Sequence, residues 1–348
     1  MKNINVPVGI SNFEKIRQDG YYYVDKTGLI KDMLKNKIPE VTLITRPRRF
    51  GKTLAMSMLA SFFDIRRDSK KLFQGLNISK EQQLCNDWMN QYPTLFLSFK
   101  DVDGTIFENA LGLLQFTIAE LCKKHTYLIE SDVVDQDDKE TFRKLKSMGS
   151  NLPELQGSII MLMNMMKAYY NKQVILLIDE YDVPIAKASS NGYYKEMLEV
   201  MKAMLSTALK DNEALKFAVV TGCLKIAKES VFTGTNNFVS DTISSERYNE
   251  YYGFTQKDVD QILQDAQIEE KASDIKEWYD GYRFGEFDVY CPWDVMNYLW
   301  DLTNNQNAKP VSYWKNTSDN AIIRSFIDYS GAAIKKKLEI LISGGSIR

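Results

Sequence analysis

Gly51, Lys52 and Thr53 form a Gly-Lys-Thr triplet whose residue types and order suit the binding of a phosphate group. The triplet follows a short apolar run at residues 41–45 and precedes a helical pattern at residues 54–63. The first N–H groups of a helix lack partners within the helix, and the helix dipole favours an anion there. In this setting glycine lets the backbone approach the phosphates, lysine reaches the β- and γ-phosphates, and threonine binds Mg²⁺ through its hydroxyl.

The residues before the triplet depart from the full phosphate-loop pattern GxxxxGK[ST]. That pattern has glycine at position 46, where this sequence has Arg46, followed by Pro47, Arg48 and Arg49. An alternative interpretation is a basic turn on the surface, since a GKT triplet also arises by chance. The strand before it and the helix after it favour the phosphate loop, and three arginines suit an anion site.

Two carboxylates follow the apolar run at residues 174–178. Asp179 stands at the carboxyl end of this predicted strand, where ligands gather in parallel sheets, and it could hold Mg²⁺ directly or through water. Glu180 is placed to polarise an attacking water. Acids after a strand are weak evidence alone, but they are strong evidence beside a GKT triplet. Thr221, after the run at residues 217–220, either contacts the γ-phosphate or water or forms a Thr-Gly turn without a ligand.

Four short apolar runs separated by helical patterns predict an α/β fold with a parallel sheet that is buried on both faces. The runs lie at residues 41–45, 94–99, 174–178 and 217–220. After about residue 240 strand-like runs disappear, and helix-start signals follow at Thr255, Ser273 and Pro292. We therefore expect a core over residues 1–240 and a mainly helical lid over residues 241–348.

Composition excludes several classes of function. The 44 Lys+Arg and 46 Asp+Glu leave a net charge of −2, so no global field attracts nucleic acid or membrane. Short basic runs at residues 66–67, 70–71 and 335–337 indicate solvated faces more often than DNA binding. No secretion signal or apolar span of ~20 residues occurs, and four cysteines without CxxC spacing favour the reducing cytoplasm. The single histidine, His125, excludes catalytic triads and multi-histidine metal sites.

Seven stretches together resemble the bacterial AAA-ATPase-like family, and the resemblance covers nearly the whole chain. The RPRRFGK motif is distinctive of that family, so Arg46 looks like the family's form of the loop. The stretches are YYYVDKTGLI (21–30), LITRPRRFGKTL (43–54), LIDEYDVPI (177–185), VTGCLKIAKESVFTGTNNF (220–238), YGFTQKDV (252–259), WYDGYRFG (278–285) and YWKNTSDN (313–320).

The resemblance implies an additional-strand P-loop ATPase of the AAA-like superfamily, with a helical lid after the core and with ATP and Mg²⁺ as cofactors. Gly51, Lys52 and Thr53 would form the phosphate loop, Asp179 the Mg²⁺ carboxylate and Glu180 the general base. Residues 23–27 would lie near the base of the nucleotide, although these tyrosines could equally be core or surface aromatics. Longer members usually continue into a PD-(D/E)xK nuclease-like domain, whose motif does not appear in this sequence.

The leading hypothesis is an ATPase in which nucleotide state moves the lid or a partner. The alternative is a nucleotide-responsive switch or scaffold with little hydrolysis, serving a nuclease or another partner; a P-loop kinase and direct DNA binding rank lower. A homo-oligomer is a further option. The residues expected to contact nucleotide are Arg46, Pro47, Arg48, Arg49, Phe50, Gly51, Lys52, Thr53, Leu54, Thr221 and Arg283, those in catalysis Lys52, Asp179 and Glu180, and those on the metal Thr53 and Asp179.

Arg283 is included because lids that follow a P-loop core usually contribute a cation to the γ-phosphate. It stands just after an Asp-Gly turn and is flanked by aromatic residues that could fix its position. The alternative is that these aromatics form the lid's own core, with Arg283 in solvent or paired with Asp280. Arg247, or an arginine from a neighbouring subunit, could serve the same purpose.

Overall fold

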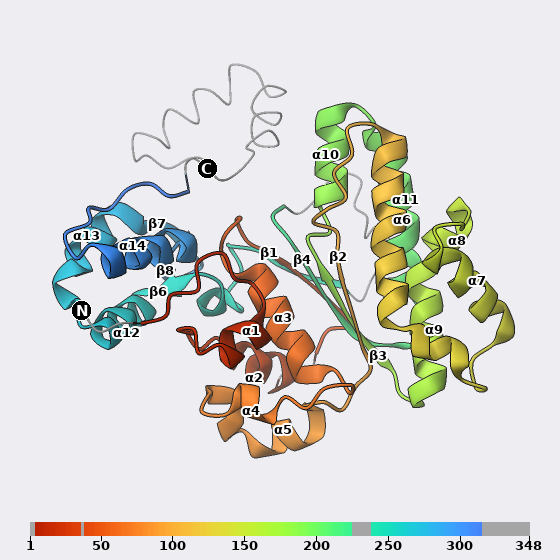
Figure 1. The fold of residues 1–348 in the computed structure, drawn as a ribbon, viewed down its shortest axis with the longest axis horizontal. Helices are drawn as coiled ribbons and strands as arrows, with labels where there is room; N and C mark the ends of the chain where they lie inside the picture. Colours follow the sequence, from red (N-terminus) through yellow and green to blue (C-terminus); the bar gives the residue numbers. More distant parts are fainter. Residues whose placement is uncertain (1–3, 36–37, 225–237, 315–348) are drawn as a thin grey trace.

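The computed structural model describes residues 4–35, 38–224 and 238–314 (Figure 1). At its centre is a parallel sheet of five strands in the order β2-β3-β4-β1-β5, so that β4 lies between β1 and β3. The fold is α/β, and the four apolar runs of the sequence are confirmed as β1 to β4. The strands are β1 Val41–Thr45, β2 Thr94–Ser98, β3 Val174–Asp179, β4 Leu215–Gly222 and β5 Phe238–Asp241.

Helices cover both faces of the sheet, so the central strands β1, β3 and β4 are buried along almost their whole length and are mostly apolar. Ile175 and Leu177 of β3 pack on one face, and Leu176 and Ile178 pack on the other. The first face carries α1 Phe13–Gln18, α2 Gly28–Lys35, α3 Lys52–Phe63, α4 Lys70–Phe73 and α5 Gln82–Trp88. The second carries α6 Phe107–Lys124, α7 Gln136–Lys146, α8 Leu152–Gln156, α9 Ser158–Tyr170, α10 Val183–Asn191 and α11 Tyr194–Leu209.

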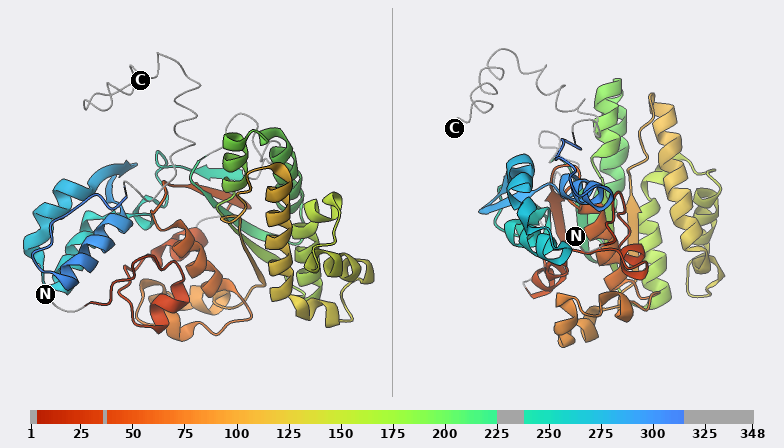
Figure 2. Two further views of the ribbon diagram at one scale, coloured as in Figure 1. Left: turned by 45° about the horizontal axis from the view of Figure 1, so that its top comes forward. Right: turned by 60° about the vertical axis from the view of Figure 1, so that its left-hand side comes forward.

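Residues 242–314, called here the C-terminal unit, form a second hydrophobic core together with Val6, and Tyr22 and Val24 pack against it. The unit lies beside the core on the side away from α6 and α11 in all views (Figures 1 and 2). Its helices are α12 Gln256–Ala266, α13 Ala272–Tyr279 and α14 Pro292–Asn304. It also contains an antiparallel sheet in the order β6-β8-β7, made of β6 Phe254–Thr255, β7 Asp280–Phe284 and β8 Phe287–Tyr290.

The expectation that strands end near residue 240 is therefore wrong. The strands of the small sheet have two to five residues, too few for an alternating pattern to stand out. Two helix-start signals are confirmed, because Thr255 forms a capping box with Asp258 and Pro292 opens α14. The signal at Ser273 is displaced, since α13 begins after Lys271.

Four short 3₁₀ helices complete the described elements: η1 Asn77–Lys80, η2 Thr126–Glu130, η3 Asn249–Tyr251 and η4 Glu269–Lys271. In the described ranges, no helix is both long enough and apolar enough to cross a membrane. The basic run at residues 335–337 and most of the stretches at residues 220–238 and 313–320 lie outside those ranges.

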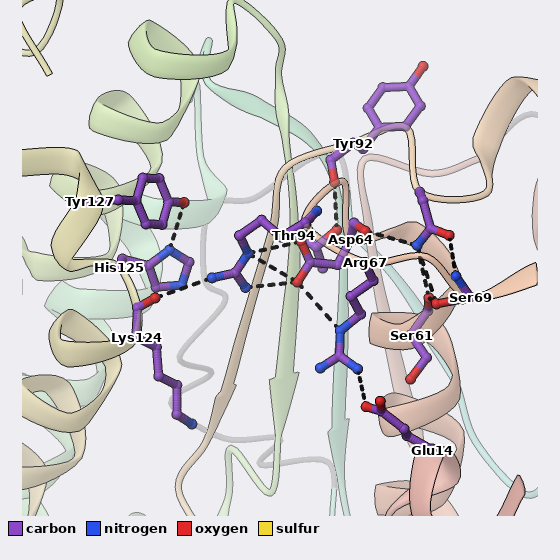
Figure 3. Close-up of polar contacts among 12 residues, drawn as sticks. Glu14, Ser61, Asp64, Arg67, Ser69, Tyr92, Thr94, Lys124, His125 and Tyr127 are labelled. Atoms are coloured by element: carbon purple, nitrogen blue, oxygen red, sulfur yellow. Dashed lines mark hydrogen bonds and ion pairs between the residues drawn. The ribbon is translucent and has the colours of Figure 1, made fainter. Parts of the chain in front are cut away.

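A polar cluster lies where α3 ends, at the beginning of β2 (Figure 3). Asp64 accepts a hydrogen bond from Arg66 Nη2 at 2.8 Å and lies 3.7 Å from Arg67 Nε. Arg67 also pairs with Glu14 at 2.7 Å. The basic run at residues 66–67 is thus paired with acids of this chain.

His125 is buried beside this cluster. Burial and the nearby Arg66 charge lower the pKa of His125 from 6.5 to about 3. Below pH 6.5 the histidine therefore binds a proton in the unfolded chain but stays neutral in the folded chain. The free energy of unfolding then falls by up to about 1.4 kcal/mol for each pH unit of acidification. We expect the free energy of unfolding in urea to fall more steeply between pH 6 and 4 for wild type than for His125→Gln. Parallel pH profiles would contradict a neutral buried histidine.

Candidate functional site

The carboxyl ends of β1, β4 and β3 lie side by side at one edge of the sheet. Thr45 at the end of β1 is paired with Gly222 of β4, and Ile178 of β3 is paired with Val220. Ligands of open α/β proteins bind at this edge, where the strands lead into loops. The predicted proximity of the GKT triplet and Asp179 is thereby confirmed.

Residues 46–51 form the loop that joins β1 to α3, which begins at Lys52. Gly51 has φ 81°, in the left-handed region that favours glycine, and Arg49 has φ 71°. The first helical hydrogen bond runs from Ala55 N to Gly51 O at 2.9 Å. The N–H groups at the start of α3 therefore have no carbonyl partner within the helix and remain suited to an anion.

The Lys52 ammonium is turned back onto its own loop. Nζ donates to the carbonyl oxygens of Arg46 at 3.0 Å and Pro47 at 2.9 Å, and it lies 3.5 Å from Cys223 Sγ. These neutral carbonyl partners leave the positive charge uncompensated by hydrogen bonding to an acid. An incoming phosphate would offer the ammonium a charge-assisted hydrogen bond in their place.

Asp179 is fully buried and joins two hydroxyl groups. Its Oδ2 accepts from Thr53 Oγ1 at 2.8 Å, and its Oδ1 accepts from Thr221 Oγ1 at 2.5 Å. A carboxylate and a hydroxyl are the oxygen donors that Mg²⁺ uses in nucleotide sites, so the residues fit this metal. Nowhere in the described part of the chain do three or more His, Cys, Asp or Glu residues gather for a metal, so the remaining ligands would be phosphate and water.

Glu180 directly follows Asp179 and lines the same cavity as Lys52. Burial raises its pKa, the Asp179 charge raises it further, and the charges of Lys52 and Arg48 act in the opposite direction. Its φ of 55° lies in the left-handed region, which is uncommon for a residue with a side chain. A carboxylate with a raised pKa accepts protons more readily, which suits a general base.

The chain that leaves β4 is fixed to β3 by the two residues after Glu180. Asp182 Oδ2 accepts from the N–H groups of Cys223 and Leu224, both at 2.9 Å, and Tyr181 Oη donates to Leu224 O at 2.8 Å. A Cβ at Gly222 would lie 2.6 Å from the Tyr181 ring, so only glycine fits there. These contacts hold Thr221 against Asp179 and Cys223 beside Lys52.

A cavity of about 570 Å³ extends from the loop toward the C-terminal unit. The core contributes residues 48–55, Met58, Lys100, Glu180, Val183, Lys187 and Cys223. Sequence reasoning missed most of the remaining lining, which comes from residues 7–11, Ile16, Tyr251, Gly253, Phe254, Pro292, Trp293, Met296 and Asn297. Residues 293 and 297 are four positions apart and therefore lie on one face of a helix. This spacing was the signal in the sequence that both could line one site.

Tyr22, Tyr23, Val24 and Lys26 also line this cavity, while a place of residues 23–27 near the base of the nucleotide stays a prediction. Tyr23 Oη donates to Met58 Sδ at 3.3 Å, and Lys26 pairs with Asp258 at 2.6 Å. The stretch therefore also connects the core with α12.

Four of the expected nucleotide contacts do not line the cavity: Arg46, Pro47, Thr221 and Arg283. Pro47 and Thr221 lie next to the cavity: Pro47 O accepts a hydrogen bond from Lys52, and Thr221 Oγ1 donates one to Asp179. Arg46 instead forms a buried ion pair with Asp241 at 2.6 Å, because a buried guanidinium needs a counter-ion. Arg283 is exposed, with Nε donating to Gly285 O at 3.3 Å, which corresponds to the solvent-facing alternative.

Comparison with known proteins identifies relatives of the chain. A family model described as "Predicted AAA-ATPase" matches residues 7–232. The chain is also similar to an "Uncharacterized protein in vnfD 5'region" of Azotobacter chroococcum mcd 1, with 29% identity over 298 residues. That alignment covers 85% of this chain and 52% of the relative, so the chain spans about half the length of that protein.

Proposed function

Because the chain belongs to the predicted AAA-ATPase family, we propose that it binds ATP with Mg²⁺ at the loop of residues 46–53 and hydrolyses the bound ATP. The observation that carries this proposal is the placement of Thr53 and Thr221 on the two oxygens of Asp179, directly beside the start of α3. The Thr53 hydroxyl of α3 and the Asp179 carboxylate of β3 would hold Mg²⁺, which would supply positive charge beside the phosphates.

The charges around the cavity define the part that each residue would take. Lys52 would exchange its loop carbonyls for the β- and γ-phosphates, while the backbone N–H groups of residues 51–54 would contact phosphate oxygens. Thr53 and Asp179 would hold Mg²⁺, which supplies positive charge to the phosphates when it is bound. Glu180 would accept the proton of an attacking water. Catalysis would then rest on positioning and charge neutralisation.

Steady-state phosphate release is the experiment that tests hydrolysis. Wild-type protein with ATP and Mg²⁺ should release phosphate continuously, and chelation of the metal should stop the release. Binding of Mg·ATP without release would instead support the alternative of a nucleotide-responsive scaffold. Addition of DNA to the same assay tests the lower-ranked DNA-dependent activity, and we expect no stimulation by it.

Arg48 is a better candidate than Arg283 for the cation near the γ-phosphate. Arg48 lines the cavity, and its charge acts on Glu180 and Cys223, whereas Arg283 is exposed and does not line it. Arg48→Ala should lower the hydrolysis rate about tenfold or more while ADP affinity changes little, because the lost contact involves only the γ-phosphate. Arg283→Ala is the matched control, with an expected change below about twofold. The reverse pattern would return the role to Arg283.

For the movement that ATP binding and hydrolysis would drive, we propose a class of partner and not a single protein. Nucleotide state would move the C-terminal unit or a partner, and the partner would be a nuclease-like domain, another protein or a second copy of the chain. The extra length of the Azotobacter relative is compatible with a further domain in that protein. A cytoplasmic location remains a prediction from cysteine usage.

A further inference from the structure

Arg46 stands where the usual loop pattern has glycine, and its side chain is anchored away from the cavity. Nη2 lies 2.6 Å from Asp241 Oδ1 and 2.8 Å from Asn249 Oδ1, and Nη1 donates to Asp241 O at 3.0 Å. The side chains of Arg46 and Asp241 are both fully buried. The guanidinium also lies over the rings of Tyr252 and Phe284, at 5.2 and 5.6 Å. The first residue of the loop is thus fixed to β5, η3 and β7.

Two more loop residues contact the C-terminal unit. Phe50 is fully buried, with its ring centroid 4.7 Å from that of Tyr282 and 5.1 Å from that of Phe284. The Arg49 guanidinium lies 4.0 Å from the ring centroid of Trp293 in α14. Three residues of the six that connect β1 to α3 therefore pack on the C-terminal unit or the strand that leads into it.

The backbone of Arg46 carries this anchoring to the phosphate lysine. Arg46 N donates to Gly222 O at 3.2 Å, and Arg46 O accepts from Lys52 Nζ at 3.0 Å. A displaced Arg46 side chain would shift the carbonyl oxygen that accepts from the Lys52 ammonium, because the guanidinium and this carbonyl belong to the same residue.

We propose that Arg46 is a positioning residue whose ion pair with Asp241 sets the loop and Lys52 for a nucleoside triphosphate. Packing of the C-terminal unit and affinity for the triphosphate are then linked through the contacts of Arg46 with Asn249 and Phe284 and through Phe50. The inference rests on the proposed function, since it concerns the same loop. By thermodynamic reciprocity, a nucleotide that favours one loop arrangement also stabilises the matching arrangement of the C-terminal unit.

The test is a double-mutant cycle between Asp241 and Lys52, with ATP affinity measured by calorimetry in the presence of Mg²⁺. Asp241→Asn keeps the size of the side chain but leaves the Arg46 charge buried without its counter-ion. We expect it to weaken ATP binding about tenfold or more in the wild-type background. In the Lys52→Ala background the same change should have little effect, because the ion pair acts through Lys52. A purely structural role would give the same loss in both backgrounds.

Asp64→Asn is the matched control. Asp64 also binds an arginine, Arg66 at 2.8 Å, but it lies at the opposite end of α3 from the loop, because α3 begins at Lys52 and ends at Phe63. This variant should lose stability while its ATP affinity stays within about twofold of wild type. An equal loss of affinity in Asp64→Asn and Asp241→Asn would overturn the proposal.

Phe50→Leu provides the second variant if Asp241→Asn does not fold. It keeps an apolar side chain but loses the ring contacts with β7, and its smaller loss of affinity should likewise vanish in the Lys52→Ala background. If wild type binds ATP and folded Asp241→Asn has unchanged affinity for it, the proposal is overturned. If Asp241→Asn does not fold, unchanged ATP affinity in Phe50→Leu overturns the proposal in the same way. Failure of wild type to bind ATP would instead overturn the proposed function, so the two failures are distinguishable.

Discussion

Glu180→Gln is expected to slow ATP hydrolysis by about 100-fold or more while leaving ATP affinity near the wild-type value. Glutamine keeps the size and hydrogen-bonding capacity of the side chain but cannot accept the proton of the attacking water. Glu180 lines the cavity with Lys52, and burial together with the Asp179 charge raises its pKa above 4.5. A single-turnover assay with saturating Mg·ATP measures the chemical step, and calorimetry measures binding.

The pH dependence gives a second readout of the same change. The base must be deprotonated to act, so wild-type hydrolysis should decline as the pH falls through the raised pKa of Glu180, and this step should be absent in the variant. Glu277→Gln, on the exposed surface of α13, is the matched control. Wild-type rates in Glu180→Gln would place the base elsewhere. Asp182 would be next, although it is buried and accepts two backbone N–H groups.

Lys52→Ala is expected to weaken Mg·ATP binding by roughly 10- to 150-fold, the range of about 1.5–3 kcal/mol for a hydrogen bond to a charged group. In the structure the ammonium donates to two carbonyl oxygens and to the Cys223 thiol, so it can turn to phosphate without breaking an ion pair with an acid. Titration calorimetry with ATP and Mg²⁺ measures the loss.

Lys100→Ala is the matched control for this prediction. Lys100 lines the same cavity but stands outside the loop, with its side chain 62% exposed and only a 3.9 Å ion pair to Asp101. Its replacement should change ATP affinity by less than about threefold, because exposed charges are screened by solvent. Unchanged affinity in Lys52→Ala, with the folded state verified by its thermal transition, would be incompatible with a phosphate loop at residues 46–53.

The central sheet was largely predictable because its inner strands are covered on both faces. A buried strand needs a continuous apolar run, and β1, β3 and β4 each provide one. The edge strand β5 is not predicted by the sequence, because Phe238–Asp241 contains only two apolar residues and pairs with β1 alone. The strands β6 to β8 are not predicted by the sequence because each is short, and β7 and β8 also expose part of their length.

At the site, local motifs were predictable and long-range partners were not. The GKT triplet and the carboxylates that begin at Asp179 are each short runs of adjacent residues, so each is recognisable in the sequence. Their meeting at one sheet edge follows from the parallel topology. The partner of Arg46 is 195 residues away, and nothing near Asp241 in the sequence marks it as a counter-ion. The sequence therefore predicts phosphate contacts for the whole RPRR stretch, whereas the structure separates Arg46 from Arg48 and Arg49, which line the cavity.

The most direct test of a Mg·ATP site at this loop is the anomalous scattering of Mn²⁺ in crystals of Glu180→Gln grown with ATP. Mn²⁺ accepts the same oxygen ligands as Mg²⁺, and the slow variant should keep its triphosphate intact. The account predicts one Mn²⁺ peak within bonding distance of Thr53 Oγ1, next to Asp179, with the triphosphate along residues 47–53 and the γ-phosphate near Lys52. A metal or triphosphate bound elsewhere, with the loop unoccupied, would contradict it.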